Sequence, residues 1–451
     1  MAFDEVRRVV AKLESDIARG PIVPTVTPQE IQSYLAARYD FTKPLDLDDV
    51  TADVERMLRM WQVQVTHPRY FGLFNPSVTL ASIIADTLVA MYNPQLATWR
   101  TSPVANEIER HTLAWLTDKF GFPANASASF TSGGTEANLS AVIVALTRAF
   151  PEYGENGLRG LSALPTIYMT GAAHHGYQKI AHMTGLGRRA IRTVATDRRM
   201  KMDLGDLARQ VAADRKSGFA PFMVVGTAGT TAAGVIDPLP DLARLCGSEK
   251  LWFHADAAWG GAAIISPRLR PHLAGIDAAD SITCDAHKWF SVPMGAGMFF
   301  CRHSDSVSEA FRVETLFMPE KTAAVHDPYK MSIQWSRRFI GLKLFFALAQ
   351  HGESGYVEMI EHQARMGDVL RESLNRAGWR IVNTTPLPVV CFTRDGLDTA
   401  KFLVALHQRQ IAWMSEVGLG DGAPAIRACI TSFRTTESDI AWVVREMGRL
   451  T

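Results

Sequence analysis

The sequence predicts an α/β protein in which a mainly parallel sheet, covered by helices on both faces, precedes a smaller α+β unit. Between about residues 130 and 300, short apolar runs alternate with helical segments, which is the pattern of such a sheet. From Gly341 onward, a long helical stretch leads into shorter strands and helices. The length of 451 residues allows a large core and indicates two or more structural units.

The composition is that of a globular protein in water and excludes several functional classes. The chain is 47% hydrophobic and 21% charged, and its net charge of +1 favours neither nucleic acid nor a membrane as a partner. The N-terminus lacks the apolar core of a secretory signal, and no run approaches the roughly 18 apolar residues of a membrane helix. Five cysteines without a CxxC pair suit a reducing compartment, so we expect a cytoplasmic protein.

The first 66 residues predict three helices. Apolar residues from Val6 to Ile17 keep a helical period, and Thr27 to Glu30 form a capping box with proline at the first helical position. Leu47–Gln64 is the third helix. Because these helices have no large core of their own, we expect them to pack on something else, either a second subunit or the rest of the same chain.

The remaining elements follow from length and pattern. Pro68–Pro76 is an aromatic, turn-rich loop, Leu80–Met91 a buried helix and Val104–Phe120 a long helix. Further predicted elements are strands at Thr166–Met169, Phe222–Gly226, Leu251–His254, Trp379–Val382, Val389–Thr393 and Ala425–Thr431, and helices at Asp398–Gln408 and Glu437–Met447.

A lysine, Lys288, follows a half-apolar run and precedes a loop that contains Pro293, Gly295 and Gly297. Open α/β sheets bind ligands beyond the carboxyl ends of their strands, and a desolvated lysine forms a Schiff base with an aldehyde. Taken alone, a lysine of this kind is most often a solvated surface residue. Its neighbours in the sequence decide between these interpretations.

Two upstream stretches favour a cofactor site. Leu251 to Asp256 is typical of a buried strand ending in a carboxylate, which requires a cation such as a pyridinium N–H, and Ala258 leaves room for a flat ring. Ser132 to Thr135 is a glycine-rich turn that opens a helix, where backbone N–H groups bind phosphate. A phosphate cradle, a buried aspartate and a lysine in this order describe a pyridoxal phosphate site.

Seven short stretches carry a resemblance to a known family, and they are His67-Pro68-Arg69-Tyr70-Phe71, Ser132-Gly133-Gly134-Thr135, His175, Thr227-Ala228-Gly229-Thr230-Thr231, His254-Ala255-Asp256-Ala257-Ala258, His287-Lys288-Trp289 and Arg337-Arg338-Phe339. From about His67 onward, the chain resembles the group II pyridoxal-phosphate-dependent amino acid decarboxylases, which include the aromatic amino acid and glutamate decarboxylases. The resemblance implies the PLP-dependent transferase fold type I (aspartate aminotransferase-like). It also implies a homodimer with shared active sites. The expected units are a dimer-embracing helical segment (1–84), a large cofactor-binding domain (85–340) and a small α+β domain (341–451).

The resemblance implies a role for each cofactor residue. Lys288 would hold pyridoxal phosphate as a Schiff base, Asp256 would keep its ring nitrogen protonated, and His175 would stack on the ring opposite Ala258. His175 is chosen over His174 by its spacing to Ala181. The remaining cofactor ligands implied are Ser132, Gly133, Gly134, Thr135, Thr227, His287 and, reaching the partner subunit's phosphate, Ser336. Asp285 departs from the pattern, because a carboxylate is a poor phosphate ligand.

The resemblance also implies a substrate pocket for a small amino acid. Leu73, Phe74 and Asn75 are wall candidates, Arg100 would reach the other subunit's active site, and Arg427 is a candidate for the substrate α-carboxylate. Leu73 and Phe74 favour an apolar or aromatic side chain, whereas Arg100 would favour an acidic one. For both Arg100 and Arg427, the alternative interpretation is a purely structural role without substrate contact.

One departure concerns the reaction itself. Phe317 stands where family decarboxylases carry a loop tyrosine that protonates the substrate carbon after CO2 leaves, and phenylalanine has no proton to donate. Tyr329 and His326 are the candidate replacements. The resemblance therefore implies decarboxylation of an L-amino acid to its amine, or alternatively the chemistry of a decarboxylating aldehyde synthase, a cyclase or an aldol-type lyase.

Two other classes of function fit the sequence less well. A nucleotide-binding protein would use the glycine-rich turn, but the chain has no GxxxxGK[ST] motif. A dimeric binding module without catalysis would have no use for Lys288. No metal site is expected, since His174 and His175 are adjacent and no Cys/His cluster surrounds them.

Overall fold

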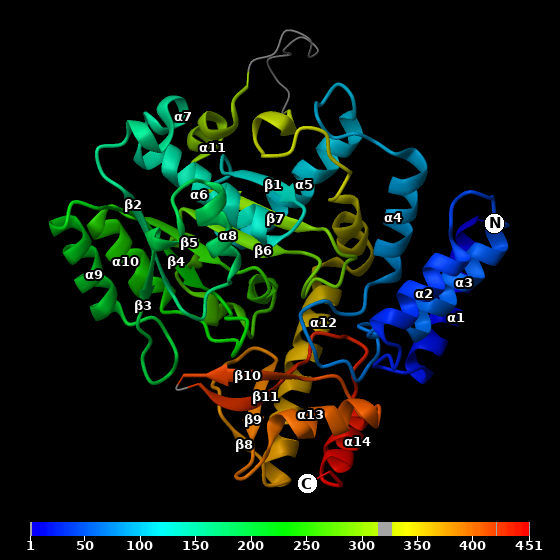
Figure 1. The fold of residues 1–451 in the computed structure, drawn as a ribbon. Helices are drawn as coiled ribbons and strands as arrows, with labels where there is room; N and C mark the ends of the chain where they lie inside the picture. Colours follow the sequence, from blue (N-terminus) through cyan, green and yellow to red (C-terminus); the bar gives the residue numbers. More distant parts are fainter. Residues whose placement is uncertain (1, 314–326, 421, 451) are drawn as a thin grey trace.

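Seven strands form a mixed sheet at the centre of the structure, a computed structural model that describes residues 2–313, 327–420 and 422–450 (Figure 1). The strand order is β1-β7-β6-β5-β4-β2-β3. Their bounds are β1 Ser127–Thr131, β2 Pro165–Thr170, β3 Ile191–Val194, β4 Ala220–Thr227, β5 Trp252–Asp256, β6 Ser281–Asp285 and β7 Gly297–Cys301. Only β7 runs against its neighbours β1 and β6, which confirms the prediction of a mainly parallel sheet.

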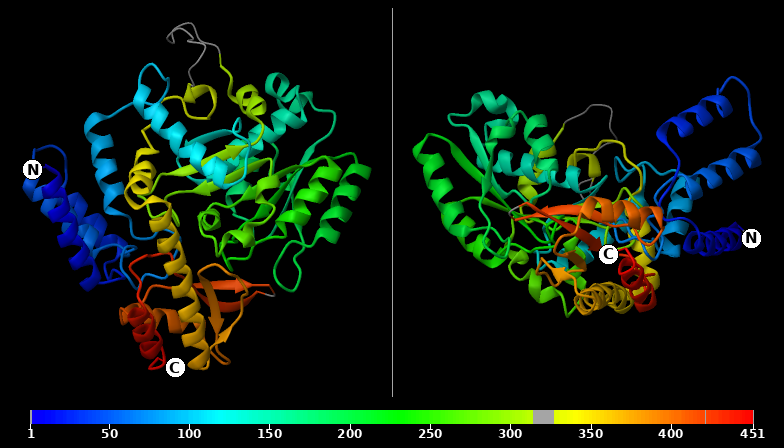
Figure 2. Two further views of the ribbon diagram at one scale, coloured as in Figure 1. Left: turned by 180° about the vertical axis from the view of Figure 1, so that it is seen from behind. Right: turned by 60° about the horizontal axis from the view of Figure 1, so that its bottom comes forward.

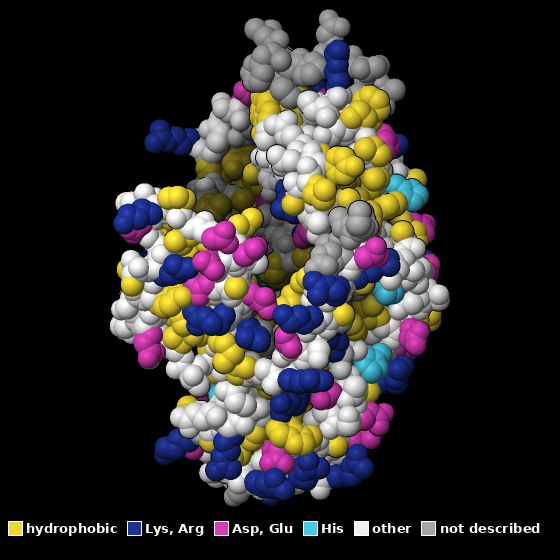
Figure 3. All heavy atoms as spheres, turned by 90° about the vertical axis from the view of Figure 1, so that its right-hand side faces the viewer, with side chains coloured by type: hydrophobic (Ala, Val, Ile, Leu, Met, Phe, Trp, Pro, Cys, Tyr) yellow, Lys and Arg dark blue, Asp and Glu magenta, His cyan; other side chains and the backbone are white. Residues whose placement is uncertain are grey.

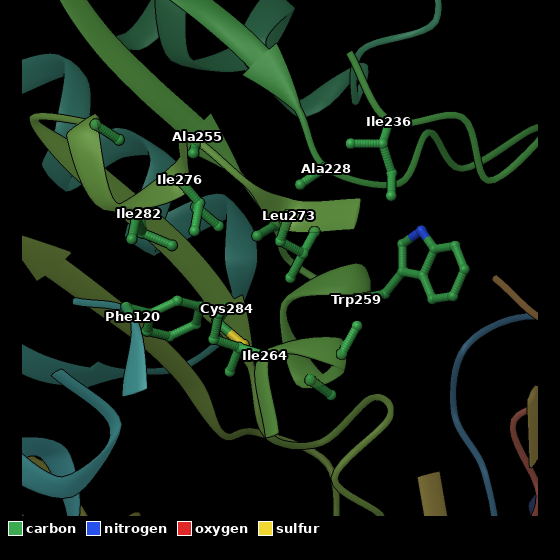
Figure 4. Close-up of a cluster of buried hydrophobic side chains, with 14 of the residues drawn as sticks. Phe120, Ala228, Ile236, Ala255, Trp259, Ile264, Leu273, Ile276, Ile282 and Cys284 are labelled. Atoms are coloured by element: carbon green, nitrogen blue, oxygen red, sulfur yellow. The ribbon is translucent and has the colours of Figure 1, made fainter. Parts of the chain in front are cut away.

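Helices cover both faces of this sheet because successive strand residues point to opposite sides. In β4, Met223 and Val225 pack towards α6, α8 and their neighbours, whereas Val224 packs towards α9 and α10. The helices of the large unit are α5 Pro103–Lys119, α6 Gly134–Ala149, α7 Tyr153–Asn156, α8 Gly176–Met183, α9 Leu204–Lys216, α10 Leu239–Glu249 and α11 Ser304–Phe311. The cluster that includes Ala255, Ile282, Leu273 and Trp259 shows the second face in close-up (Figure 4).

A second, antiparallel sheet belongs to the smaller C-terminal unit. Its order is β10-β11-β9-β8, with bounds β8 Arg380–Ile381, β9 Val389–Thr393, β10 Ser415–Leu419 and β11 Ala423–Cys429. Three helices, α12 Leu342–Arg376, α13 Thr399–Gln408 and α14 Glu437–Met447, pack on one face of it. The long helix α12 connects the two units and kinks at Gly352, whose φ of 64° is accessible to glycine.

The N-terminal helices α1 Ala2–Arg19, α2 Pro28–Arg38 and α3 Leu47–Met60 project away from both sheets (Figure 2). The predicted capping box is present, since Glu30 accepts the N–H of Thr27 and Thr27 accepts that of Glu30. Helix α3 ends before the predicted Gln64, whose side-chain amide instead donates to two carbonyls of the last turn. Helix α4, Leu80–Tyr92, lies along α12.

The described helices and one face of the molecule show the character of the surface. None of the helices in the described ranges is both long and apolar enough to cross a bilayer. On the face drawn in Figure 3, basic and acidic side chains are interspersed with apolar ones around a hollow.

Candidate active site

A cavity of about 360 Å³ opens where β4, β5 and β6 end and where α6 begins. Adjacent parallel strands bring their carboxyl ends to the same edge of the sheet, so Thr227, Asp256 and Asp285 meet there. Of the predicted cofactor residues, Ser132, Gly133, Gly134, Thr135, Thr227, Asp256, Ala258, His287 and Lys288 line this cavity. It is also lined by Glu136, Asn138, His174, Gly229, Thr231, Trp259, Asp285 and Met294.

The glycine-rich turn forms one wall of the cavity, and its shape requires glycine. Gly134 is the first residue of α6, and a Cβ added to it would lie 2.8 Å from Oδ2 of Asp285. Glu136 accepts hydrogen bonds from the backbone N–H of Ser132 at 2.9 Å and from its hydroxyl at 2.6 Å, which fixes the turn. The positive end of the α6 dipole therefore faces the cavity and suits an anion.

A buried carboxylate, Asp256, forms the opposite side. Its Oδ2 accepts a hydrogen bond from the side-chain amide of Asn138 at 2.9 Å, and its Oδ1 accepts the backbone N–H of Ala258 at 3.2 Å. No ion pair joins Asp256 to a cationic side chain within the described part of the chain. A buried anion without a cation favours a positively charged ligand atom in this cavity.

Behind Asp256, a chain of neutral donors crosses the sheet. Because the amide of Asn138 donates to Asp256, its oxygen accepts from Nε2 of His254 at 3.1 Å. Nδ1 of His254 then accepts the hydroxyl of Ser281 at 2.7 Å, and that hydroxyl oxygen accepts the indole N–H of Trp252 at 2.9 Å. Burial lowers the pKa of His254 to about 4, so the imidazole is neutral and every bond points towards Asp256.

Lys288 lies across the cavity, with its Nζ 2.9 Å from Oδ2 of Asp285. Burial opposes its charged form, but the carboxylates of Asp285 and Asp256 outweigh burial and raise the pKa of Lys288. The neighbouring His287 accepts the backbone N–H of Ala296 on Nδ1 at 3.1 Å, and burial lowers its pKa, so it carries its proton on Nε2. The buried hydroxyl of Thr227 has no hydrogen-bond partner in the structure.

His174, rather than the predicted His175, lines this cavity. The backbone N–H of Gly176 donates to Nδ1 of His174 at 3.1 Å at the start of α8, and this bond orients the ring. Desolvation lowers the pKa of His174, which leaves a neutral ring with its proton on Nε2. The spacing to Ala181 selected His175, but the turn before α8 directs the two adjacent side chains differently, and His175 lines only the neighbouring cavity.

The neighbouring cavity, of about 870 Å³, adjoins the first through His174 and Thr231, which line both. Leu73 and Arg427, two of the predicted substrate contacts, line it. Arg427 is buried and donates to the carbonyls of Thr231 and Gly72 at 2.9 and 3.0 Å, but its Nη2 has no partner. Its two backbone carbonyl partners therefore fix Arg427 at the cavity wall.

An aromatic stack lies beside the first cavity, which Trp259 lines. The ring of Phe74 stacks on Trp259 at a centroid distance of 4.4 Å, and the guanidinium of Arg427 lies 4.8 Å from the centre of the Phe74 ring. Phe74 is therefore buried behind the wall and supports Arg427.

The other predicted substrate and partner-reaching residues lie away from these cavities. Asn75 accepts a hydrogen bond from the hydroxyl of Tyr70 at 3.3 Å, and Arg100 is exposed. Ser336 is also exposed and accepts a hydrogen bond from Gln95 at 2.8 Å. A single chain brings none of these three into the site.

Tyr329, one candidate replacement for the missing loop tyrosine, does not line the site cavity. Tyr329 is buried, its ring lies 4.7 Å from that of Trp335, and its N–H donates to the carbonyl of Ala97. Phe317 and His326 lie outside the described residues.

Four residues that line the site were not predicted from the sequence, and they are Asn138, Trp259, Glu136 and Met294. Asn138 lies one helical turn after Gly134, so the α-helical period places both on the same face of α6, and this signal was available. Trp259 directly follows the Ala258 that was singled out. Glu136 carried no signal, because acidic residues in the first turn of a helix are common.

Comparisons with known proteins agree with this geometry. The model of the pyridoxal-dependent decarboxylase conserved domain matches residues 28–394. The chain is 28% identical over 400 residues to the aromatic-L-amino-acid decarboxylase of Bacillus atrophaeus, covering 86% of this chain and 82% of that protein. It is 30% identical over 359 residues to an acidic amino acid decarboxylase of Mus musculus, covering 77% and 65%.

A third relative carries a different activity in its name. The 4-hydroxyphenylacetaldehyde synthase of Rhodiola rosea is 26% identical over 421 residues, covering 89% of this chain and 84% of that protein. Its solved structure matches with a TM-score of 0.89 at 24% identity, covering 99% of this chain and 97% of that one. The fold is therefore fold type I, as the sequence analysis expected.

Proposed function

The chain belongs to the pyridoxal-dependent decarboxylase family and uses pyridoxal phosphate as its cofactor, and we propose that it decarboxylates an L-amino acid to the corresponding amine and CO2. The observation that carries this proposal is the cavity in which Lys288 faces a buried Asp256 that has no cationic partner among the described residues. A pyridine aldehyde requires an amine at its aldehyde carbon and an anion at its ring nitrogen. Lys288 and Asp256 would supply these two groups.

The residues present fit this cofactor. The N-terminus of α6 at Gly134 and Thr135 would hold its phosphate, Lys288 would hold its aldehyde carbon as a Schiff base, and Asp256 would accept its ring N–H. The bound cofactor withdraws electrons from the substrate α-carbon as CO2 leaves. His174 and Ala258 line the same cavity and are proposed to flank the ring.

The protein side chains set the proton positions. Asp256, held by Asn138 and Ala258, would keep a proton on the ring nitrogen, because a fixed anion favours the charged form of its neighbour. The neutral imidazole of His174 offers an N–H from Nε2 to the cavity. Arg427, which lines the neighbouring cavity, is proposed to orient the substrate carboxylate.

The substrate side chain is expected to lie in the neighbouring cavity. Leu73, which lines this cavity, supports an apolar or aromatic side chain. An acidic side chain would require Arg100, which could reach the cavity only from a partner subunit.

Phe317 gives specific support to a second outcome, an aldehyde synthase that decarboxylates and then oxidatively deaminates. Phenylalanine at the position of the loop tyrosine removes the expected proton donor, and a relative of this chain is named as an aldehyde synthase. Tyr329 is proposed as the replacement donor for simple decarboxylation, although its ring packs against Trp335 here.

One assay separates these outcomes. Purified protein with pyridoxal phosphate is offered each of the twenty amino acids, ornithine and 2,4-diaminobutyrate, while CO2, amine, aldehyde and peroxide are measured together. One amine per CO2 supports the decarboxylase, and aldehyde with peroxide supports the synthase. If Lys288→Ala matches the wild type in CO2 release, or if no substrate releases CO2, the proposal is wrong.

We also propose a homodimer in which the N-terminal helices cover the partner subunit. Leu47 on α3 is 75% exposed and Leu58 is 52% exposed, although both are apolar. An apolar face of this kind is typical of a protein interface. All five cysteines are buried and unpaired, which supports a cytoplasmic location.

A further inference from the structure

A buried carboxylate, Asp237, connects the walls of the two cavities, although it lines neither of them. The residue is 2% exposed. Its Oδ2 accepts the backbone N–H of Thr227 at 2.8 Å, and its Oδ1 accepts the backbone N–H of Met202, also at 2.8 Å. Its own N–H donates to the carbonyl of Thr227 at 2.9 Å. One side chain therefore holds backbone groups of two segments that are distant in the sequence.

The first of these segments is the end of β4, which borders the cofactor cavity. Thr227 is the last residue of β4 and lines that cavity. The strand register places it opposite Asp256, and the N–H of the following Ala228 donates to the carbonyl of Asp256 at 2.8 Å. A shift of Thr227 would therefore reach the carboxylate that is proposed to accept the ring N–H of the cofactor.

The second segment is the turn at residues 196–202, which is closed by an isolated bridge between Thr196 and Met202. Thr196 and Met200 of this turn line the neighbouring cavity. Met200 has a φ of 61°, a left-handed conformation that a residue with a side chain keeps only where its surroundings fix it. The bond from the N–H of Met202 to Asp237 attaches this strained turn to the rest of the large unit.

Charge also depends on the setting of Asp237. Burial raises its pKa to about 6, while its two backbone N–H partners and Lys201 of the turn lower it and Asp197 of the turn raises it. The first turn of α10, which follows Asp237, carries Asp241 in an ion pair with Arg244. Below about pH 6, Asp237 takes up a proton, so one oxygen becomes a donor and the side chain no longer accepts both N–H groups.

From this geometry we propose that Asp237 is a positioning residue that couples the two cavities. A cofactor beside Thr227 restrains the end of β4, and Asp237 passes this restraint to the turn that forms part of the wall of the neighbouring cavity. The inference rests on the proposed function, because it requires the cofactor in the first cavity and the substrate in the second. Loading of the cofactor then orders the substrate wall above about pH 6 and does not order it in more acidic solution.

The test follows hydrogen exchange by mass spectrometry in peptides that contain Met202, with and without saturating pyridoxal phosphate, at about pH 8. In the wild type, the cofactor should slow exchange in residues 196–202 several-fold. Asp237→Asn keeps one acceptor oxygen but turns an amide N–H2 towards the second N–H, so the cofactor should no longer slow exchange there. Retention of the wild-type slowing in Asp237→Asn would overturn the inference.

The matched control is Asp280→Asn. Asp280 also accepts a backbone N–H, that of Phe253 at 2.7 Å, but near the start of β5 and away from the cavity. This variant should lose stability and keep the cofactor-dependent slowing in residues 196–202. Loss of that slowing in Asp280→Asn as well would assign the effect to general destabilisation and would contradict a coupling role for Asp237.

The wild type alone provides a second test that does not depend on the folding of a variant. At about pH 5, with rates corrected for the intrinsic pH dependence of exchange, saturating cofactor should no longer slow the turn, because Asp237 is then mostly protonated. Equal slowing at both pH values would contradict the inference. A wild type that does not bind pyridoxal phosphate at about pH 8 would instead reject the proposed function, and this inference with it.

Discussion

At the scale of single residues, Asp256 depends on a directed chain of hydrogen bonds. Trp252, Ser281, His254 and Asn138 each donate to the next group, and the last donates to Asp256. All these side chains are buried, so a missing member leaves an unpaired polar group. The chain fixes the carboxylate from behind and leaves its cavity side to a ligand.

Asn138→Ala is expected to weaken this support. Loss of the donor to Asp256 and of the acceptor for His254 should cost about 1–3 kcal/mol in unfolding free energy and lower kcat by about tenfold or more. The matched control is Asn106→Ala, since Asn106 is a buried asparagine that donates to the carbonyls of Thr98 and Ser102, both in the turn before α5. The control should lose stability and keep kcat, whereas equal kcat in both variants would deny Asn138 its role.

The low pKa of His254, about 4, predicts an acid-sensitive fold. Because the folded state binds its proton less readily than the unfolded state, stability is full above about pH 6.5 and is lost as pH falls towards 4, by up to about 3 kcal/mol. In urea titrations from neutral to acidic pH, His254→Gln should lose less stability than the wild type. His182→Gln, at an exposed position, should follow the wild type, and parallel curves for all three proteins would refute the assignment.

At the scale of elements, the sequence predicts what depends on local pattern. The strands at β2, β4 and β5 and the helices α13 and α14 lie within two residues of their expected bounds, because buried apolar runs and capping residues mark them. β10 was missed because it alternates exposed and half-buried residues and contains Gly418 at the edge of its sheet. The unit boundaries at residues 84/85 and 340/341 stay predictions.

The residues of the site also divide into those that sequence patterns predict and those that depend on the folded structure. The meeting of Thr227, Asp256 and Lys288 could be predicted because strand ends in a parallel sheet converge. The choice between His174 and His175 could not, because it depends on the turn before α8 and on a hydrogen bond to Gly176. The Lys288–Asp285 pair depends on side-chain positions that spacing alone does not determine.

The start of α6 gives a prediction about backbone space. Gly134→Ala places a methyl group 2.8 Å from Oδ2 of Asp285, closer than carbon and oxygen normally approach, so the turn must shift. We expect binding of pyridoxal phosphate to weaken by tenfold or more, on the order of 1.4 kcal/mol. Gly154→Ala is the control, because nothing lies within 4 Å of the added atom. Unchanged affinity in Gly134→Ala would show that the turn does not hold the cofactor.

At the scale of the whole molecule, the N-terminal helices have a large exposed surface beside the compact units (Figure 2). Neither α2 nor α3 contains a fully buried residue, although both are capped and well-formed helices. Isolated helices of this length are marginally stable in water, so their order requires a packing surface. A second copy of the chain would supply one.

Leu58→Glu, at a side chain 52% exposed on α3, should therefore shift the protein from dimer to monomer in light scattering at micromolar concentration. Leu164→Glu, at a side chain 64% exposed before β2, is the control and should remain dimeric. A wild-type protein that is monomeric over the same concentrations would reject the proposed assembly.

The proposed function depends most directly on which residue holds the cofactor. Borohydride reduction of the protein loaded with pyridoxal phosphate, followed by peptide mass spectrometry, should find the pyridoxyl group on Lys288, the lysine that lines the cavity with Asp256. A pyridoxyl group on another lysine, such as Lys179 or Lys343, or the absence of any covalent label, would contradict the proposed function.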